Sequence, residues 1–270
     1  FISPFWIHGR LVTHLRCGPI FLCGDAAHIH SPAGGQGMNT GLQDAYNLAW
    51  KLALVIERAA PMTLLDSYEA ERYPVIREAV NQNEYFTKMA LFDTEFLSKL
   101  RQFSQALTRD EARISRRIGH WLTQLNIQYQ SSLMVRGLGI HAKSPQVGER
   151  AIDVVFEMTQ HLYRHLHPTQ FNLLCFVGPF STADEWDAAQ QLTGALQGMY
   201  ADFIDIHYIA KNNTHNTHHT ILDVDDTLYK AYHITQPTLY LIRPDGYIAY
   251  ATTQFDVTQL MGVLNQYLHT

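Results

Sequence analysis

A glycine-rich turn between a short strand and a helix is the feature that most constrains this chain. The turn covers residues 24–39 and follows the apolar run Ile20-Phe21-Leu22-Cys23, which predicts a strand. Three of the four positions from 34 to 37 are glycine, so the main chain there can approach a ligand without interference from a Cβ. The helix expected from about Thr40 would aim its N-terminal amides at an anionic or electron-rich group. We therefore expect a ligand-binding turn, with Asp25 as its carboxylate at the end of the strand.

This run resembles the second flavin-binding motif of the aromatic-ring flavin monooxygenases, the p-hydroxybenzoate and phenol hydroxylase type. The likeness continues without a gap through residues 40–52 and returns in residues 64–74. It implies an FAD-dependent enzyme that hydroxylates an aromatic, phenolic small molecule with NAD(P)H and O2, and homodimers are frequent in that family. The cofactor-binding positions that it implies are Asp25, Pro32, Gly34, Gly35, Gly37, Met38 and Asn39.

The resemblance also implies a role for each part of the turn. Asp25 would accept a hydrogen bond from the ribityl chain, although it could instead simply cap the turn. Gly37, Met38 and Asn39 would offer backbone amides to the pyrimidine edge of the flavin, where reduction places negative charge that a helix N-terminus stabilises. Pro32 would border the reacting face or merely rigidify the loop. The catalytic residues themselves, including the base that activates the phenol, are not identified in this chain.

The G-x-G-x-x-G turn that holds the ADP half of FAD in this family is absent from the sequence. Because the chain also opens at Phe1 rather than Met, we expect the C-terminal portion of a longer enzyme. We further expect that the 270 residues alone hold no FAD and are inactive, with residues 31–39 mobile or collapsed.

Helical periodicity dominates the first half of the chain. Apolar residues recur every three or four positions over residues 42–56, which predicts an amphipathic helix with an apolar face. A second helix should start near Thr63 and be kinked or restarted at Pro74. The helical pattern continues over residues 75–107 and 110–134.

The second half of the chain is richer in strands. Glycine, serine and proline predict a linker at residues 136–139 and 143–145. Helices are expected at residues 183–201 and 257–267, and a hairpin turn at residues 244–246. Strands of one sheet are expected at residues 173–177, 204–208, 239–242 and 248–250.

This order of elements resembles the thioredoxin-like C-terminal domain of phenol-hydroxylase-type enzymes. The redox motif C-x-x-C of thioredoxins is replaced here by residues 178–181, Gly-Pro-Phe-Ser, and Cys175 has no partner, so disulfide exchange is not expected. The likeness also predicts a cis peptide bond at Gln236–Pro237. We therefore expect an α/β fold class: a mostly helical remnant of an FAD-binding domain (residues 1–135), then a thioredoxin-like α/β domain (residues 145–270).

Composition excludes several classes of protein. The net charge is −5 without a basic run, which argues against a nucleic-acid partner, and no apolar stretch reaches the ~20 residues that a membrane span requires. The three cysteines cannot make a disulfide framework, so a reducing cytoplasm is the expected location.

Two motifs suggest other functions. His28 and His30 form an H-x-H pair, but two ligands do not make a metal site, and we expect them to pack in the loop. Asp223, Asp225 and Thr227 match the D-x-D-x-T motif of haloacid-dehalogenase-type phosphatases, but the later residues of that active site are missing. The main alternative to an enzyme is a non-catalytic, thioredoxin-like interaction module.

Overall fold

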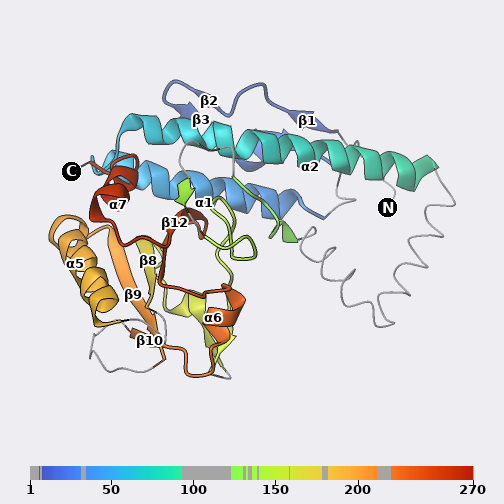
Figure 1. The fold of residues 1–270 in the computed structure, drawn as a ribbon. Helices are drawn as coiled ribbons and strands as arrows, with labels where there is room; N and C mark the ends of the chain where they lie inside the picture. Colours follow the sequence, from blue (N-terminus) through green and yellow to red (C-terminus); the bar gives the residue numbers. More distant parts are fainter. Residues whose placement is uncertain are drawn as a thin grey trace, which may run out of the picture. The chain divides into compact units, whose positions relative to one another are not determined.

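The computed structural model describes residues 6, 8–31, 35–92, 123–129, 132, 136–138, 140–157, 159–177, 182–211 and 220–269 (Figure 1). The chain divides into two compact units. One comprises Phe1–Leu52 and Leu65–Ile127, and the other comprises Ala53–Leu64 and Gln128–Thr270. Helices and strands occur in both, in agreement with the expected α/β class.

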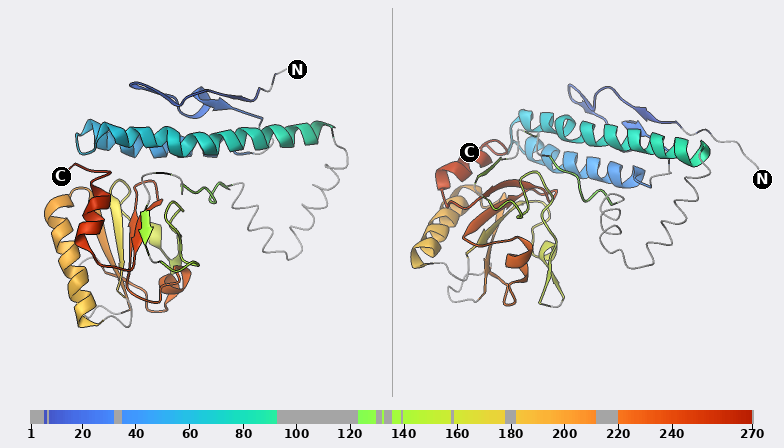
Figure 2. Two further views of the ribbon diagram at one scale, coloured as in Figure 1. Left: turned by 45° about the horizontal axis from the view of Figure 1, so that its top comes forward. Right: turned by 45° about the vertical axis from the view of Figure 1, so that its right-hand side comes forward.

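The first unit combines short strands with two long helices that lie side by side (Figures 1 and 2). Its strands are β1 (Arg10–Leu11), β2 (Arg16–Cys17), β3 (Ile20–Phe21) and β4 (His28–Ile29), and its helices are α1 (Gly37–Ile56) and α2 (Asp66–Phe92). Strand β1 pairs antiparallel with β4, and β2 pairs antiparallel with β3. The apolar core of this unit contains Leu15, Ala27, Leu48, Tyr68, Ile76 and Val80.

Helix α1 confirms the helix predicted over residues 42–56, and it buries a polar face in addition to Leu48 of its apolar stripe. Leu42 and Ile56 of the apolar stripe are 61% and 75% exposed. The buried polar positions, which follow one another at helical spacing, are Thr40, Asp44, Asn47 and Lys51. These groups can be buried because α2 presents charged partners to them, which offsets the cost of removing polar groups from water.

Helix α2 continues through Pro74 without a restart, so one of the two expected outcomes at that position did not occur. The helical prediction for residues 75–107 holds as far as Phe92, and residues 93–122 lie outside the described residues. In the helix predicted over residues 110–134, the described positions after Thr123 form turns and coil. That part of the prediction is wrong, and the left-handed backbone of Gln124 (φ 56°) is incompatible with a continuing helix.

The second unit is built on a six-stranded sheet in the order β10-β9-β8-β11-β12-β5. Its strands are β5 (Arg136–Leu138), β8 (Phe171–Phe176), β9 (Ile204–Ala210), β10 (Thr220–Leu222), β11 (Thr238–Ile242) and β12 (Ile248–Thr252). Strand β8 is parallel to β9 and antiparallel to β11, which is in turn antiparallel to β12. The four predicted strands therefore lie in one sheet, as expected from the sequence. A further antiparallel pair, β6 (Val155–Phe156) and β7 (Gln160–His161), lies outside this sheet.

The prediction of a linker at residues 136–139 is wrong for residues 136–138. These residues form β5, an edge strand that pairs parallel with β12. Gly137 suits this strand because a Cβ there would lie 2.8 Å from Cγ1 of Val147, so only glycine allows the close approach. Residues 143–145 do belong to a turn, in which the amide of Ser144 donates to the carbonyl of His141.

Helices cover both faces of this sheet (Figure 2). They are α5 (Ala183–Tyr200), α6 (Thr227–Ala231) and α7 (Val257–Leu264). Phe171 of β8 contacts Tyr267 just after α7, whereas Phe176 contacts Tyr229 of α6. Because side chains alternate along a strand, α6 and α7 lie on opposite faces.

Local sequence signals set the ends of these helices. Thr182 and Glu185 form a capping box at the start of α5, and Asp256 accepts the amides of Thr258 and Gln259 at the start of α7. Both helices were expected, although α7 ends at Leu264 rather than at residue 267.

The predicted hairpin turn joins β11 to β12. Gly246 has φ +83° and donates its amide to the carbonyl of Arg243.

The prediction of a cis peptide bond at Gln236–Pro237 is wrong, because no peptide bond in the described part of the chain is cis. Pro237 directly precedes β11, where a trans proline removes no donor from the middle of the ladder. Residues 178–181 lie outside the described residues, and Cys175 is buried within β8.

The D-x-D-x-T motif has a structural role. The Asp223 carboxylate is 1% exposed, and it accepts the amides of Thr227 and Tyr229 at 2.7 and 3.0 Å. It thus accepts hydrogen bonds from the amides at the start of α6, which have no partner within the helix, instead of facing solvent as a nucleophile would.

Among the described residues, no helix is long and apolar enough to cross a membrane.

Candidate functional site

The glycine-rich turn leads from β3 to the N-terminus of α1. Asp25 lies in a short 3-10 helix, η1 (Gly24–Ala26), and its side chain is exposed. Gly35 has φ +63°, a conformation that favours glycine, and α1 begins at Gly37. Met38 is 76% exposed, while Asn39 is half-buried. Pro32 and Gly34 lie outside the residues that the structure describes.

The first turn of α1 carries amides that the helix itself cannot satisfy. Thr40 is the first residue whose amide makes an i to i−4 bond, to the carbonyl of Gln36 at 2.9 Å. The amides of Gly37, Met38 and Asn39 precede it and therefore have no acceptor within the helix. They form the positive end of a 20-residue helix dipole, next to a solvent-exposed surface.

A close backbone contact holds η1 against α1. Gly24 has φ +58°, and a Cβ on Gly41 would lie 3.3 Å from the Cα of Gly24. Two glycines therefore let the turn that carries Asp25 pack directly on the second turn of the helix. The exposed carboxylate and the orphan amides thus belong to one corner of the first unit.

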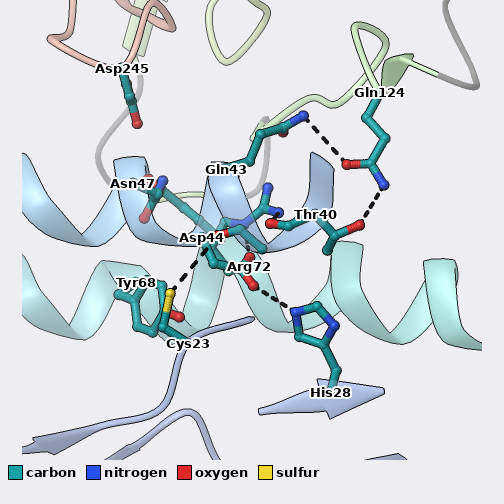
Figure 3. Close-up of polar contacts among 12 residues, drawn as sticks. Cys23, His28, Thr40, Gln43, Asp44, Asn47, Tyr68, Arg72, Gln124 and Asp245 are labelled. Atoms are coloured by element: carbon teal, nitrogen blue, oxygen red, sulfur yellow. Dashed lines mark hydrogen bonds and ion pairs between the residues drawn. The ribbon is translucent and has the colours of Figure 1, made fainter. Parts of the chain in front are cut away.

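A buried polar network lies beneath this corner (Figure 3). The Asp44 carboxylate accepts Nε of Arg72 at 2.7 Å through Oδ1 and contacts Nε2 of His28 at 2.7 Å through Oδ2. Both carboxylate partners and Asp44 itself have side chains no more than 2% exposed. Arg72 also donates from Nη2 to the carbonyl of Thr40 at 3.3 Å. One carboxylate thus connects β4, α1 and α2.

Gln124 joins the same region from a distant part of the chain. Its amide donates to Oγ1 of Thr40 at 2.7 Å and accepts Nε2 of Gln43 at 3.4 Å (Figure 3). The left-handed φ of Gln124 is costly for a residue with a Cβ, and it directs this side chain onto the first turns of α1.

A second buried ion pair joins the same two helices farther along. Nζ of Lys51 lies 2.9 Å from Oε2 of Glu71, and both side chains are fully buried. Asn47 donates to the same carboxylate oxygen at 2.8 Å and accepts from Lys51 at 2.8 Å.

Burial and negative charge raise the pKa values of two groups beside the turn, Tyr68 and Cys23. Burial raises the pKa of the Tyr68 hydroxyl, and the nearby Asp44 carboxylate raises it further. The same two causes, in the same order, raise the pKa of the Cys23 thiol. Both groups stay protonated, and the Tyr68 hydroxyl donates to the carbonyl of Leu22 at 2.8 Å.

Sequence reasoning found the turn but missed the residues beneath it. His28 was expected to pack in the loop, and the structure shows that it does so by pairing with Asp44. No group of three or more potential metal ligands occurs among the described residues. The helical spacing of the polar residues in α1 could have predicted a buried polar face, but the apolar residues of the same helix show a similar spacing.

Comparison with known proteins places this corner in context. Residues 2–83 match a family described as FAD binding domain. The chain is 32% identical to 6-methylpretetramide 4-monooxygenase of Streptomyces rimosus, over 99% of this chain and 47% of that protein. It is 29% identical to phenol 2-monooxygenase fsqG of Aspergillus fumigatus, over 90% of this chain and 46% of that protein. Over most of its length, the chain is therefore similar to proteins named as monooxygenases.

Solved structures agree with this relationship. CabE, an aromatic hydroxylase from angucycline biosynthesis, superimposes with a TM-score of 0.64 and 28% identity, over 97% of this chain and 47% of that one. PieE, a flavin-dependent monooxygenase solved with FAD and substrate, gives a TM-score of 0.70 at 19% identity, which shows a common fold alone. The chain spans about half the length of the curated relatives named above.

Proposed function

We propose that residues 24–39 bind the flavin of FAD in an enzyme that hydroxylates an aromatic small molecule. The observation that carries this proposal is the helix N-terminus at Gly37, Met38 and Asn39, whose amides have no acceptor within α1, together with the exposed Asp25 on a short helix that packs against α1 through Gly24 and Gly41. A positive helix end suits an electron-rich ring edge, and a carboxylate suits a polyhydroxyl chain. The residues present therefore fit the cofactor that the relatives' family implies.

Each residue has a distinct task in this proposal. Asp25 accepts a hydrogen bond from a ribityl hydroxyl, and the three amides hold the pyrimidine edge of the ring. Pro32 borders the reacting face, and Gly34 and Gly35 let the main chain lie close to the cofactor. When bound, FAD supplies the redox chemistry, with NAD(P)H as the reductant and O2 as the oxidant. The protein's amides favour the reduced ring because they face the atoms on which its negative charge resides.

The overall reaction inserts one oxygen atom of O2 into an aromatic C–H bond as a hydroxyl, while the other oxygen leaves as water and NAD(P)H is oxidised. Relatives named as aromatic hydroxylases and phenol monooxygenases support an aromatic, phenolic substrate. We extend the proposal to a reducing cytoplasm, supported by the three free cysteines, and to a homodimer, which rests on the resemblance to the monooxygenase family alone.

For the second unit we propose a thioredoxin-like arrangement without redox activity. The order β9-β8-β11-β12, with β8 and β9 parallel and joined through α5, supports this arrangement. Cys175 is the cysteine nearest to the position of a thioredoxin redox motif, and burial raises the pKa of its thiol. A buried, protonated thiol is a poor nucleophile, so this unit would serve a structural role.

Substitution of Asp25 in the full-length protein tests the assignment. Asp25→Ala should raise the Kd for FAD about tenfold, because one charge-assisted hydrogen bond is worth about 1.5 kcal/mol or more. Asp225→Ala, which removes an exposed carboxylate of the second unit, should leave the Kd unchanged. Quenching of flavin fluorescence measures both constants. A wild-type protein that does not bind FAD, or an Asp25→Ala protein with the wild-type Kd, would overturn the proposal.

A further inference from the structure

We propose that His28, Asp44 and Arg72 are positioning residues for FAD: their buried ion group sets the geometry of the flavin-binding turn. The inference rests on the proposed function, because it concerns how the same turn is held in place. None of these side chains reaches the solvent-exposed corner itself, since each is no more than 3% exposed. Their effect on a cofactor would therefore be transmitted through the backbone that they hold.

The group contacts the turn at two points. Within the turn, His28 of β4 contacts Oδ2 of Asp44 at 2.7 Å. After the turn, Arg72 donates to Oδ1 of Asp44 at 2.7 Å and to the carbonyl of Thr40 at 3.3 Å. Thr40 is the residue directly after the three orphan amides, so these contacts fix the first turn of α1 relative to β4.

Helix α2 holds the turn at a second point. Asn83 donates from Nδ2 to Oε1 of Gln36 at 3.4 Å, and Gln36 is the residue just before α1. Arg72 and Asn83 are eleven positions apart, which is three helical turns, so both project from one face of α2. The His30 ring packs against Gly37, the first residue of α1. A Cβ on Gly37 would lie 3.5 Å from Cε1 of His30.

The physical character of the group favours positioning over simple stabilisation. Buried ion pairs contribute little stability relative to apolar residues of the same volume, because both charges lose their hydration. They do, however, demand a specific geometry, since removing one partner leaves a charge without compensation. A network of this kind at the base of a ligand-binding turn restricts where the amides can point.

The chain supplies a matched control. Lys51 and Glu71 form another fully buried ion pair between α1 and α2, but Lys51 lies two helical turns beyond Asp44, away from the flavin-binding turn. Neutralising Glu71 disturbs the packing of the same helices and leaves a buried cation without its carboxylate, as neutralising Asp44 does. The two substitutions thus separate helix packing from turn geometry.

The experiment compares Asp44→Asn with Glu71→Gln in the full-length enzyme. Thermal unfolding of the apoprotein, the Kd for FAD and the midpoint potential of bound flavin are measured for each variant. We expect similar decreases in Tm for both. Asp44→Asn alone should raise the Kd about tenfold, the lower end of what losing an outer-shell partner costs at metal sites. It should also shift the potential to a more negative value, since misaligned amides stabilise the reduced ring less well.

Arg72→Lys provides a second variant if Asp44→Asn does not fold. Lysine keeps the positive charge beside Asp44 but lacks the planar fork that reaches both Asp44 and the Thr40 carbonyl. We expect it to raise the Kd while lowering Tm less than Asp44→Asn does. Equal increases in Kd for the Asp44 and Glu71 variants, or an unchanged Kd and potential in Asp44→Asn and Arg72→Lys, would overturn the inference. A wild-type protein that does not bind FAD would overturn the proposed function, and the inference with it.

Discussion

Two carboxylates of the first unit accept hydrogen bonds from other segments of the chain. Asp44 contacts the side chains of His28 and Arg72 in the interior, while Glu69 at the start of α2 accepts main-chain amides. In each case a single charged side chain connects segments that are far apart in the sequence. The strength of such bonds depends on the carboxylate remaining ionised.

Glu69 makes the stability of the first unit depend on pH. Partial burial alone would raise the pKa of its carboxyl, but hydrogen bonds from His14, Arg16 and Leu15 outweigh this and lower the pKa below its usual 4.5. A carboxyl with a depressed pKa in the folded state stabilises the fold above its unfolded pKa. That stabilisation is lost as the pH falls through the folded pKa.

We expect Glu69→Gln to lower the free energy of unfolding by about 1 kcal/mol at pH 7, and by less at an acid pH below the lowered pKa of wild-type Glu69. Urea unfolding monitored by circular dichroism at both pH values measures the difference. Glu57→Gln, at an exposed carboxyl, serves as the control. A Glu69→Gln deficit that is constant over this range would contradict the role of the ionised carboxylate.

Helix α1 shows that one segment can carry two helical patterns. Its apolar residues and its polar residues both recur every three or four positions, and tertiary contacts decide which set is buried. The helix also depends on Gly41, where the turn carrying Asp25 makes its close approach.

Two glycine substitutions test that contact. Gly41→Ala would place a Cβ 3.3 Å from the Cα of Gly24, and the resulting shift should outweigh the gain in helix propensity, destabilising the protein by roughly 1 kcal/mol. Gly194→Ala in α5 meets no atom within 4 Å and should stabilise by about 0.5–1 kcal/mol. Thermal unfolding compares the two variants. A stabilised Gly41→Ala protein would show that the contact is not tight.

Among the described residues, each compact unit has an apolar core of its own. The proposed flavin-binding residues all belong to the first unit. Under the proposed function these residues contact the flavin half of FAD, and the 270 residues contain no G-x-G-x-x-G turn for its ADP half.

We expect the 270-residue chain by itself to bind FAD with a Kd of roughly millimolar, because losing half of the cofactor contacts removes several kcal/mol of binding free energy. Titration of FAD with the chain, monitored by flavin fluorescence, measures this constant. FMN, which lacks the AMP part of FAD, should bind about as weakly as FAD. A stoichiometric yellow preparation of this chain would contradict the expectation.

Local features were predictable because short-range physics determines them. The sequence alone indicated the glycine-rich turn, the Pro-Asp-Gly hairpin, helices α5 and α7, and four of the six strands of the second unit's sheet, β8, β9, β11 and β12. Each depends on residue types that restrict φ, cap a helix or alternate along a strand. The resemblance to flavin monooxygenases was carried by the same contiguous stretch.

Tertiary structure alone decided which residues support the turn. Asp44 and Arg72 are 28 positions apart and Thr40 and Gln124 are 84 apart, so no local pattern pairs them. The pairing of β5 with β12 and the buried polar face of α1 likewise depend on partners supplied by remote segments. A buried charge is stable only where such a partner arrives, and that is a property of the folded chain rather than of any stretch of its sequence.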